Sequence, residues 1–271
     1  MTAGRAQPTR LLDPLRLEAT SAGIFTDFDG TISNIVPLPG DARPLPGAVE
    51  VLHRLARVYA RVAVVSGRPA SFLAAQLDLA VHRSGLLAVG MYGMEQTDGT
   101  GAVVVRPGLE EWRDKVEEAA DRFAAGSPAA VLVERKGLGV TFHWRNAPAA
   151  AQASGQLAER LAAELGLELR RGRMAVELTA AGGWDKGVAV ATLCKGLRSA
   201  LFAGDDSGDM LAFEALDRLA KSSGLHAVKV AVENLEAPSA LAKAADLRVN
   251  EPAGVLSLLR FLAGELPRGW T

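Results

Sequence analysis

Two carboxylates stand two residues apart, directly after a short apolar segment. The segment is Gly23 to Thr26, the acids are Asp27 and Asp29, and Gly30 follows them. Residues that follow a buried strand in this way lie where open α/β sheets place their chemistry. Two carboxylates this close repel one another unless a cation or a raised pKa relieves them. The pattern therefore indicates a charged reaction site, although a loop whose acids face water or cap a helix has the same composition.

A second acidic segment follows another predicted strand. Residues 200–202 are apolar, and the loop after them carries Asp205, Asp206 and Asp209. Carboxylates are the hard oxygen ligands of divalent cations, and sparse carboxylates with room for water suit Mg²⁺ better than Ca²⁺. The calcium loop of an EF-hand is excluded because the glutamate expected at its twelfth position is missing. The two acidic segments together predict a magnesium site.

Two further side chains have the chemistry to hold a phosphate. Ser66 ends the predicted strand 61–65, where its hydroxyl and the following backbone N–H groups can point at a phosphoryl oxygen. Lys186 opens a predicted helix, where its fixed cation can balance the acids. Taken singly, Ser66 also fits a helix N-cap and Lys186 a solvated surface lysine. Four such segments in one chain are hard to explain as coincidence, and they favour phosphate chemistry.

The elements that must position these side chains alternate between strands and helices. Short apolar runs typical of buried strands alternate with helical periodicity in the first hundred residues and again after residue 182. Strands are predicted at 23–27, 61–65, 86–89, 200–202, 228–230 and 247–249, and helices at 46–58, 71–79, 186–197 and up to residue 219. A hairpin turn is predicted at 98–101. Such alternation is typical of an α/β core built on a parallel sheet.

The middle of the chain has a different order of elements. The predicted sequence is a helix, two strands, a second helix and two more strands, at 110–125, 130–134, 139–144, 148–165, 167–170 and 175–178. This order predicts a compact α+β module with its helices on one face of a mostly antiparallel sheet. We therefore predict a core in two parts, 1–105 and 182–271, with a module inserted at 106–181.

Composition limits the partners of this chain. Its 271 residues are 49% hydrophobic, which is enough for a sizeable core, and the formal net charge of −1 provides no basic stripe for nucleic acid. Cys194 is the single cysteine, so an intramolecular disulfide and a cysteine-based zinc cluster are excluded. We find no apolar run of signal-peptide or membrane-spanning length. We expect a soluble cytoplasmic protein that binds neither nucleic acid nor membrane, with no obligate protein partner evident.

The four polar segments resemble, in order, the signatures of the haloacid-dehalogenase superfamily: an acid pair, a serine, a lysine and Gly-Asp-Asp. Within that superfamily the chain is similar to the trehalose-phosphatase family. The similarity rests on Asp27–Ser33, Ile35–Pro37, Val65–Arg68, Gly90–Glu95, Val133–Lys136, His143–Arg145, Val176–Leu178, Trp184–Gly187 and Gly204–Asp206. The chain departs from the family pattern at Gly208-Asp209-Met210, where Thr-Asp-Glu is usual, and at Thr179-Ala180, where Arg-Pro is usual.

The resemblance implies a Rossmann-like, parallel-sheet hydrolase core with an inserted α+β cap domain. It implies an enzyme that hydrolyses trehalose 6-phosphate, a phosphorylated disaccharide, through an aspartyl phosphate. Asp27 would attack phosphorus, and Asp29 would protonate the leaving sugar oxygen and then act as base toward water. Ser66 and Lys186 would hold the phosphoryl oxygens.

The same resemblance implies Mg²⁺ as the cofactor. Its ligands would be the carboxylate of Asp27, the backbone carbonyl of Asp29 and the carboxylate of Asp205. Asp206 or Asp209 would lie next to these ligands and help to orient them without binding the ion directly.

Residue-by-residue similarity to the family also indicates a substrate-binding set. The candidates are Arg68 in the core and Glu134, Lys136, Arg145, Arg173 and Glu177 in the cap. His143 could join them, although it fits a half-buried strand position equally well. Charged strand faces are often only solvated, which is the alternative for the whole set. The cap would close over the site and exclude water.

Other classes of protein share part of this pattern. Phosphatases of sucrose phosphate, mannosyl-phosphoglycerate or a pseudo-disaccharide phosphate share the catalytic residues, so only the cap distinguishes them. A receiver-type signalling module also combines an acidic pair, a Ser or Thr and a Lys on a parallel sheet. Such a module needs only about 120 residues, has no cap and lacks a second acid two residues beyond the nucleophile. A catalytically idle relative is disfavoured because every catalytic position is filled.

Overall fold

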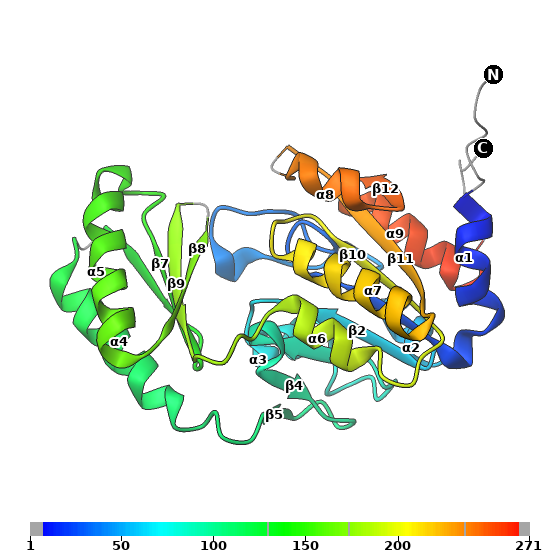
Figure 1. The fold of residues 1–271 in the computed structure, drawn as a ribbon, viewed down its shortest axis with the longest axis horizontal. Coiled ribbons are helices and arrows are strands. Elements are labelled where there is room, and N and C mark those ends of the chain that lie inside the picture. Colours follow the sequence, from blue (N-terminus) through cyan, green and yellow to red (C-terminus); the bar gives the residue numbers. More distant parts are fainter. Residues whose placement is uncertain (1–7, 129, 173, 236, 266–271) are drawn as a thin grey trace. The chain divides into compact units, whose positions relative to one another are not determined.

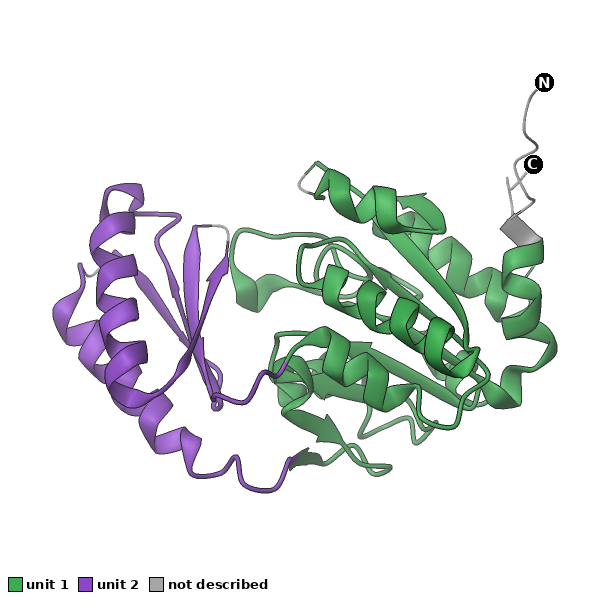
Figure 2. Ribbon diagram, in the orientation of Figure 1, with its two compact units in different colours: residues 1–104, 185–271 green, residues 105–184 purple. Residues whose placement is uncertain are grey.

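The computed structural model describes residues 8–128, 130–172, 174–235 and 237–265 (Figure 1). Contacts between Cα atoms divide the chain into two compact units, shown in different colours in Figure 2. Unit 1 comprises residues 1–104 and 185–271, and unit 2 comprises residues 105–184. Each unit has its own sheet and its own apolar core.

Unit 1 is built on an eight-stranded sheet with the order β12-β11-β10-β1-β2-β3-β4-β5. Its strands are β1 (Ala22–Thr26), β2 (Arg61–Val65), β3 (Leu87–Gly90), β4 (Glu95–Thr97), β5 (Val103–Val105), β10 (Ser199–Gly204), β11 (His226–Glu233) and β12 (Leu247–Asn250). The strands from β12 to β3 pair in parallel, and β4 pairs antiparallel to β3. After β1 the chain adds β2 and β3 on one side and later β10 to β12 on the other. The carboxyl ends of β1 and β10 therefore form a topological switch point, where sheets of this kind bind ligands.

Helices cover both faces of this sheet. They are α1 (Pro8–Leu17), α2 (Ala48–Ala56), α3 (Ala70–Gln76), α6 (Lys186–Leu193), α7 (Asp209–Ser223), α8 (Ser239–Ala244) and α9 (Glu251–Leu262). Successive residues of a strand face opposite sides, so Ile24 of β1 packs with α1, α2 and α9, while Phe25 packs with α6, α7 and α8. Because both faces are covered, the five residues of β1 are all buried.

Unit 2 has a four-stranded antiparallel sheet with the order β6-β7-β9-β8. Its strands are β6 (Leu132–Arg135), β7 (Gly139–His143), β8 (Glu168–Gly172) and β9 (Ala175–Thr179). The helices α4 (Trp112–Gly126) and α5 (Ala151–Leu165) lie on one face of the sheet (Figure 1). Their core includes Phe123 stacked on Phe142 of β7, with ring centroids 3.5 Å apart. The other face carries polar side chains of β6, β7 and β9.

The predicted fold class is confirmed, since a parallel-dominated α/β sheet and a small α+β unit are both present. The helices α1, α8 and α9 were not anticipated from the sequence. The hairpin of β4 and β5 has its turn at Asp98–Gly101, as predicted, with the N–H of Gly101 donating to the carbonyl of Asp98 at 3.1 Å. No helix in the part of the chain that the structure describes is long and apolar enough to span a lipid bilayer.

Candidate active site

Asp27 lies at the switch point of the sheet, one residue past β1. Its backbone N–H donates to the carbonyl oxygen of Ala203 in β10 at 2.8 Å, which holds the two strand ends together. Its carboxyl is buried, and Oδ2 lies 3.0 Å from Nζ of Lys186. Lys186 is the first residue of α6, and the side chain of Asp185 caps that helix by accepting from the N–H of Val188 at 2.8 Å. The cap fixes the helix start, and with it the base of the lysine side chain.

Asp205 follows β10 directly and is held from two sides. Oδ1 accepts from the hydroxyl of Thr31 at 3.2 Å, and Oδ2 accepts from Nδ2 of Asn234 at 3.0 Å. Gly30, with φ at +71°, packs so closely that a Cβ there would lie 2.1 Å from Oδ2 of Asp205. Position 30 therefore requires a glycine, since any other side chain would collide with Asp205. Sequence reasoning missed Asn234 and the role of Thr31.

Asp209 is fully buried and organises the loop between β10 and α7. Oδ1 accepts from Nζ of Lys186 at 2.7 Å. Oδ2 accepts from the backbone N–H groups of Asp205 at 2.8 Å and Asp206 at 3.0 Å. Asp206 points outward, with its side chain 57% exposed and Oδ1 3.7 Å from Nζ of Lys186. Of these two acids, Asp209 thus shapes the loop that presents Asp205.

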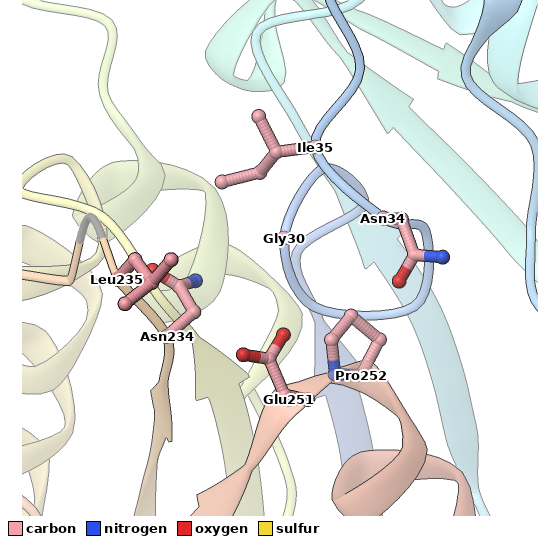
Figure 3. Close-up of a pocket in the computed structure, with 7 residues that line it drawn as sticks. All are labelled: Gly30, Asn34, Ile35, Asn234, Leu235, Glu251 and Pro252. Atoms are coloured by element: carbon pink, nitrogen blue, oxygen red, sulfur yellow. The ribbon is translucent and has the colours of Figure 1, made fainter.

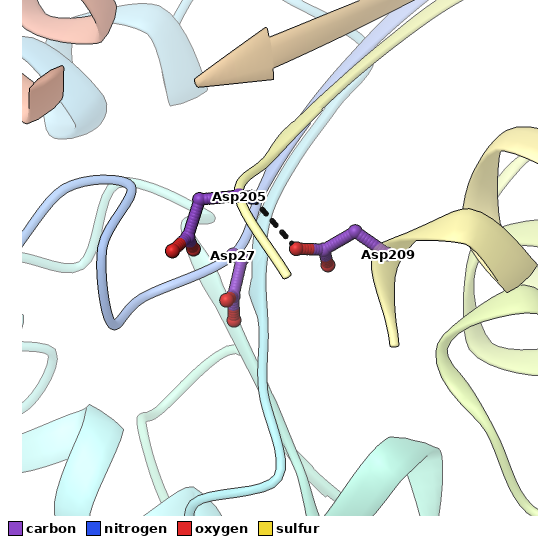
Figure 4. A group of neighbouring side chains, drawn as sticks. All are labelled: Asp27, Asp205 and Asp209. Atoms are coloured by element: carbon purple, nitrogen blue, oxygen red, sulfur yellow. Dashed lines mark hydrogen bonds between the residues drawn. The ribbon is translucent and has the colours of Figure 1, made fainter. Parts of the chain in front are cut away.

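Three buried carboxylates converge at this point, as Figure 4 shows for Asp27, Asp205 and Asp209. One ligand oxygen from each lies within 4.8 Å of the others. Three hard oxygen donors at a strand end fit a hard divalent cation such as Mg²⁺. Two of these acids, Asp27 and Asp205, belong to the predicted ligand set, and Asp209 is a third carboxylate within reach. The predicted backbone ligand, the carbonyl of Asp29, stays a prediction.

The charges of this cluster are not balanced by its own residues. Burial raises the pKa of Asp27 well above its usual value, and burial likewise raises the pKa of Asp205 to about 6 and of Asp209 to about 7. Burial opposes the charge of Lys186, but Asp206, Asp209 and Asp27 outweigh burial and raise its pKa well above the ordinary value. One ammonium therefore faces several acids, and a divalent cation would relieve the remaining repulsion.

Figure 3 shows a pocket of about 300 Å³ in unit 1. It is lined by Gly30, Asn34, Ile35, Asn234, Leu235, Glu251 and Pro252. Gly30 and Asn234 are the residues that pack against and hydrogen-bond to Asp205. The pocket therefore reaches the residues that hold Asp205, on the side of β11 and α9.

Ser66 is buried one residue past β2. Its hydroxyl oxygen accepts from the backbone N–H of Arg68 at 3.2 Å, in the turn after β2. The alternative of a helix N-cap is wrong, because the N-cap of α3 is Pro69. A hydroxyl that accepts one hydrogen bond keeps its own proton to donate. Both uses are compatible at this site.

Asp29 and Arg68 form an ion pair with two parallel hydrogen bonds. Nη2 of Arg68 donates to Oδ1 of Asp29 at 2.7 Å, and Nε donates to Oδ2 at 2.8 Å. The structure thus places Arg68, a predicted substrate-binding residue, on the predicted general acid.

The predicted sugar-binding residues of unit 2 are partly assembled on its polar face. Glu134, Thr141 and Glu177 are direct neighbours across β6, β7 and β9. Nζ of Lys136 lies 3.0 Å from Oε1 of Glu177, and Nε2 of His143 lies 2.8 Å from Oε2 of Glu134. We call these five residues the polar strand cluster: Glu134, Lys136, Thr141, His143 and Glu177.

The other two members of the predicted sugar-binding set are Arg145 and Arg173. Arg145 was expected on a strand, but β7 ends at His143, and Arg145 lies exposed in the turn that follows. The alternation of apolar and polar residues in the predicted strand 139–144 did not indicate that β7 ends at His143. Arg173 lies outside the described residues.

The fold and site together define a class of protein. A haloacid dehalogenase-like hydrolase from Bacteroides thetaiotaomicron has a similar structure, with a TM-score of 0.61, 17% sequence identity, and coverage of 89% of this chain and 99% of that one. The C-terminal domain of a trehalose-6-phosphate phosphatase from C. albicans has a TM-score of 0.74 at 22% identity, covering 98% of this chain and 99% of that one. The chain thus has the fold of haloacid dehalogenase-like hydrolases.

The family follows from the sequence comparisons. A model of the trehalose-phosphatase family matches residues 25–250, and the chain belongs to that family. A trehalose-phosphate phosphatase from Mycobacterium marinum is 33% identical over 270 residues, covering 93% of this chain and 64% of the relative. The chain spans between 49% and 64% of the lengths of the mycobacterial relatives that it matches first.

Proposed function

We propose that this chain is a phosphoric monoester hydrolase that hydrolyses trehalose 6-phosphate to trehalose and phosphate. The observation that carries the proposal is the position of Asp27, buried at the switch point with Oδ2 3.0 Å from Nζ of Lys186. A carboxylate held there by a fixed cation can approach a phosphate that the same cation attracts. Membership of the trehalose-phosphatase family supports the choice of reaction.

The first step transfers the phosphoryl group to Asp27. A carboxylate oxygen of Asp27 attacks phosphorus in line, the bond from phosphorus to the sugar oxygen breaks, and Asp29 supplies the proton to that oxygen. Water then attacks the aspartyl phosphate while Asp29 takes its proton, and the bond from phosphorus to Asp27 breaks. Phosphate leaves, and both aspartates return to their starting forms.

Other groups of the site would support these steps. Lys186 and the hydroxyl of Ser66 would hold phosphoryl oxygens, and Asp209 keeps Lys186 in place through its 2.7 Å hydrogen bond. Asp27, Asp205 and the backbone carbonyl of Asp29 would hold Mg²⁺. When bound, this ion would screen the approach of one anion to another.

Unit 2 would be the cap, predicted at 106–181, that recognises the sugar. The polar strand cluster supports this role, because it offers carboxylates and an ammonium on one sheet face to bridge pairs of sugar hydroxyls. Glu134, Lys136 and Glu177 are its charged members. Arg145 and Arg173 stay predicted candidates for binding the sugar. A phosphorylated disaccharide would be the substrate partner, and a cytoplasmic location stays a prediction.

The test is phosphate release from a panel of sugar phosphates, each assayed with Mg²⁺ and with EDTA. The panel contains trehalose 6-phosphate, sucrose phosphate, mannosyl-phosphoglycerate and glucose 6-phosphate. We expect trehalose 6-phosphate to have the highest kcat/KM, by at least about tenfold, because a polar site loses binding when a hydroxyl partner is missing. If another sugar phosphate of the panel has a higher kcat/KM, that sugar phosphate is the preferred substrate and trehalose 6-phosphate is not. If the protein hydrolyses no member of the panel, the proposal is wrong.

A further inference from the structure

We propose that Arg68 is a positioning residue that holds the carboxyl group of Asp29 for its acid and base steps, instead of contacting the substrate. The inference rests on the proposed function, in which Asp29 exchanges a proton with the leaving sugar oxygen and then with water. It replaces the role in substrate binding that the sequence suggested for Arg68.

The contacts of Arg68 are directed into the protein. Two N–H groups grip both oxygens of Asp29, at 2.7 and 2.8 Å, and Nη1 donates to the carbonyl oxygen of Pro39 at 2.6 Å. A guanidinium has five N–H groups in a fixed plane, so three of its five donors are committed to named protein partners. A guanidinium that served the substrate would instead present its fork to the phosphate.

The surroundings of Arg68 are built to keep it in this orientation. Its guanidinium carbon lies 4.7 Å from the ring centre of Phe72 in α3, and that ring packs edge-on against Phe28 with centroids 5.6 Å apart. Phe28 is fully buried between the two catalytic aspartates in sequence. The side chain of Arg68 is only 11% exposed, compared with 36% for Asp29. The arginine is thus the fixed partner, and the aspartate is the one that reaches toward solvent.

This arrangement addresses a requirement of the proposed mechanism. A general acid must lie within hydrogen-bond reach of the oxygen that it serves, and a misplacement of about 1 Å can cost about 10²-fold in rate. Asp29 lies on a loop after β1, where a partly exposed carboxyl could otherwise take several rotamers. The two-point grip of Arg68 fixes both the position and the plane of the carboxyl group, which a single-point ammonium cannot do.

Arg68 also links two parts of the site. Its backbone N–H donates to the hydroxyl oxygen of Ser66 at 3.2 Å, while its side chain holds Asp29. The segment after β2 therefore orients one group proposed to hold the phosphate and one group proposed to move protons.

The test compares two substrates that share the phosphate but differ in leaving group. Trehalose 6-phosphate has a poor leaving group and needs the acid, whereas p-nitrophenyl phosphate has an activated one and needs it little. The ratio kcat/KM reports the steps up to leaving-group release, so later hydrolysis of the aspartyl phosphate does not affect it. For Arg68→Ala we expect kcat/KM to fall about 10- to 100-fold with trehalose 6-phosphate and less than about threefold with the aryl phosphate. Inhibition by inorganic phosphate should be unchanged.

Three further variants sharpen the result. Arg68→Lys keeps the charge but not the fork, so we expect it to recover less than about a third of the lost activity. Arg68→Ala combined with Asp29→Asn should be no slower than Asp29→Asn alone, because the arginine acts through the aspartate. Arg43→Ala is the matched control. Arg43 is exposed and donates to the carbonyls of Gly40 and Ala42 at 2.7 and 2.8 Å, in the same loop as Pro39. Its loss should leave kcat/KM unchanged for both substrates.

The opposite result has a distinct signature. If Arg68→Ala raises KM for both substrates equally and weakens inhibition by phosphate, Arg68 contacts the substrate and the proposal is wrong. An additive loss in the double variant, or an unchanged kcat/KM with trehalose 6-phosphate, would also overturn it. Failure of the proposed function looks different, because the wild-type protein itself would then not hydrolyse trehalose 6-phosphate. The same comparison would then use whichever alkyl phosphate the wild-type protein does hydrolyse.

Discussion

Nζ of Lys186 lies 2.7 Å from Oδ1 of Asp209, and the side chains of both residues are buried. The pair joins the first residue of α6 to the first residue of α7. Because Asp209 also accepts from two backbone N–H groups of the loop after β10, the loop and the lysine depend on one carboxylate.

Asp209→Asn should therefore destabilise the protein. Removing one partner of a buried ion pair typically costs about 3–5 kcal/mol. Asp27 would remain as the other buried partner of Lys186, so the lower end of this range applies. We expect the free energy of unfolding, measured by denaturant titration, to fall by this amount. Asp206→Asn is the matched control: its side chain is 57% exposed, 3.7 Å from the lysine, and should change stability by less than about 1 kcal/mol. Equal effects of the two changes would contradict the central role of Asp209.

Removal of divalent cations should abolish turnover. Asp27, Asp205 and Asp209 converge within 4.8 Å, with Lys186 as the ammonium that ion-pairs with two of them, Asp27 and Asp209. We expect EDTA to lower phosphate release at least about 100-fold and Mg²⁺ to restore it. Mg²⁺ should also raise the melting temperature, since a cation that binds the native state stabilises it. Asp205→Asn should lose most of that rise; full activity in excess EDTA would refute the metal site.

Glu134→Ala should separate sugar recognition from phosphate chemistry. A carboxylate oxygen of Glu134 accepts from Nε2 of His143 at 2.8 Å, and Glu134 lies on the polar face of the sheet of unit 2. We expect kcat/KM for trehalose 6-phosphate to fall about 10- to 100-fold, the loss of one or two hydrogen bonds to a charged group, with little change for p-nitrophenyl phosphate.

A control for Glu134→Ala is available on the opposite side of unit 2. Glu159→Ala removes a carboxylate from α5, which covers the other face of the sheet, and should affect neither substrate. If Glu134→Ala lowers kcat/KM for both substrates together, the role of Glu134 is structural. If it lowers kcat/KM for neither substrate, the polar strand cluster is only a solvated face.

The stability of the protein should fall in mild acid because of His53. Its ring is buried, with Nδ1 2.6 Å from Oγ of Ser84 and Nε2 2.7 Å from the carbonyl oxygen of Leu77. Burial lowers the pKa of His53, and the nearby His82 adds to that shift. The unfolded chain, with a histidine pKa near 6.5, therefore binds the proton first. The contribution of His53 is complete above about pH 6.5 and is lost as the pH falls through its lower folded pKa.

The measurement for His53 is the free energy of unfolding between pH 7.5 and 5. We expect the wild-type protein to lose stability more steeply over this range than His53→Gln. His82→Gln, which changes an exposed neighbour that contributes less to the pKa shift than burial does, should keep most of the wild-type slope. Parallel slopes for the wild-type protein and His53→Gln would contradict the assignment.

The strand ends of the core could be predicted from the sequence because burial on both faces leaves a strong signal. The predicted strand 61–65 coincides with β2, and the acids at 27 and 205 directly follow β1 and β10. The same rule could have found Asn234, which directly follows β11. It was overlooked because β11 was predicted to end at residue 230.

Side-chain direction was the part that the sequence could not supply. Arg68 follows a serine and a glycine at a strand end, a position from which its guanidinium can reach either a phosphate or Asp29. Only the fold brings Phe72 and the carbonyl of Pro39 around it and so selects Asp29. The position of Asp209 in the sequence likewise does not determine whether its side chain faces water or Lys186.

The most direct test of the account is the site of phosphoryl transfer. The wild-type protein, Asp27→Asn and Asp29→Asn are mixed with an activated aryl phosphate, quenched in acid and digested, and the phosphorylated residue is located by mass spectrometry. We predict an aspartyl phosphate on Asp27 in the wild-type protein and in Asp29→Asn, whose turnover of trehalose 6-phosphate should be about 10²–10⁴-fold slower. Asp27→Asn should carry none. Phosphate on another residue, or equal labelling of the two variants, would contradict the assignment of Asp27 as the nucleophile.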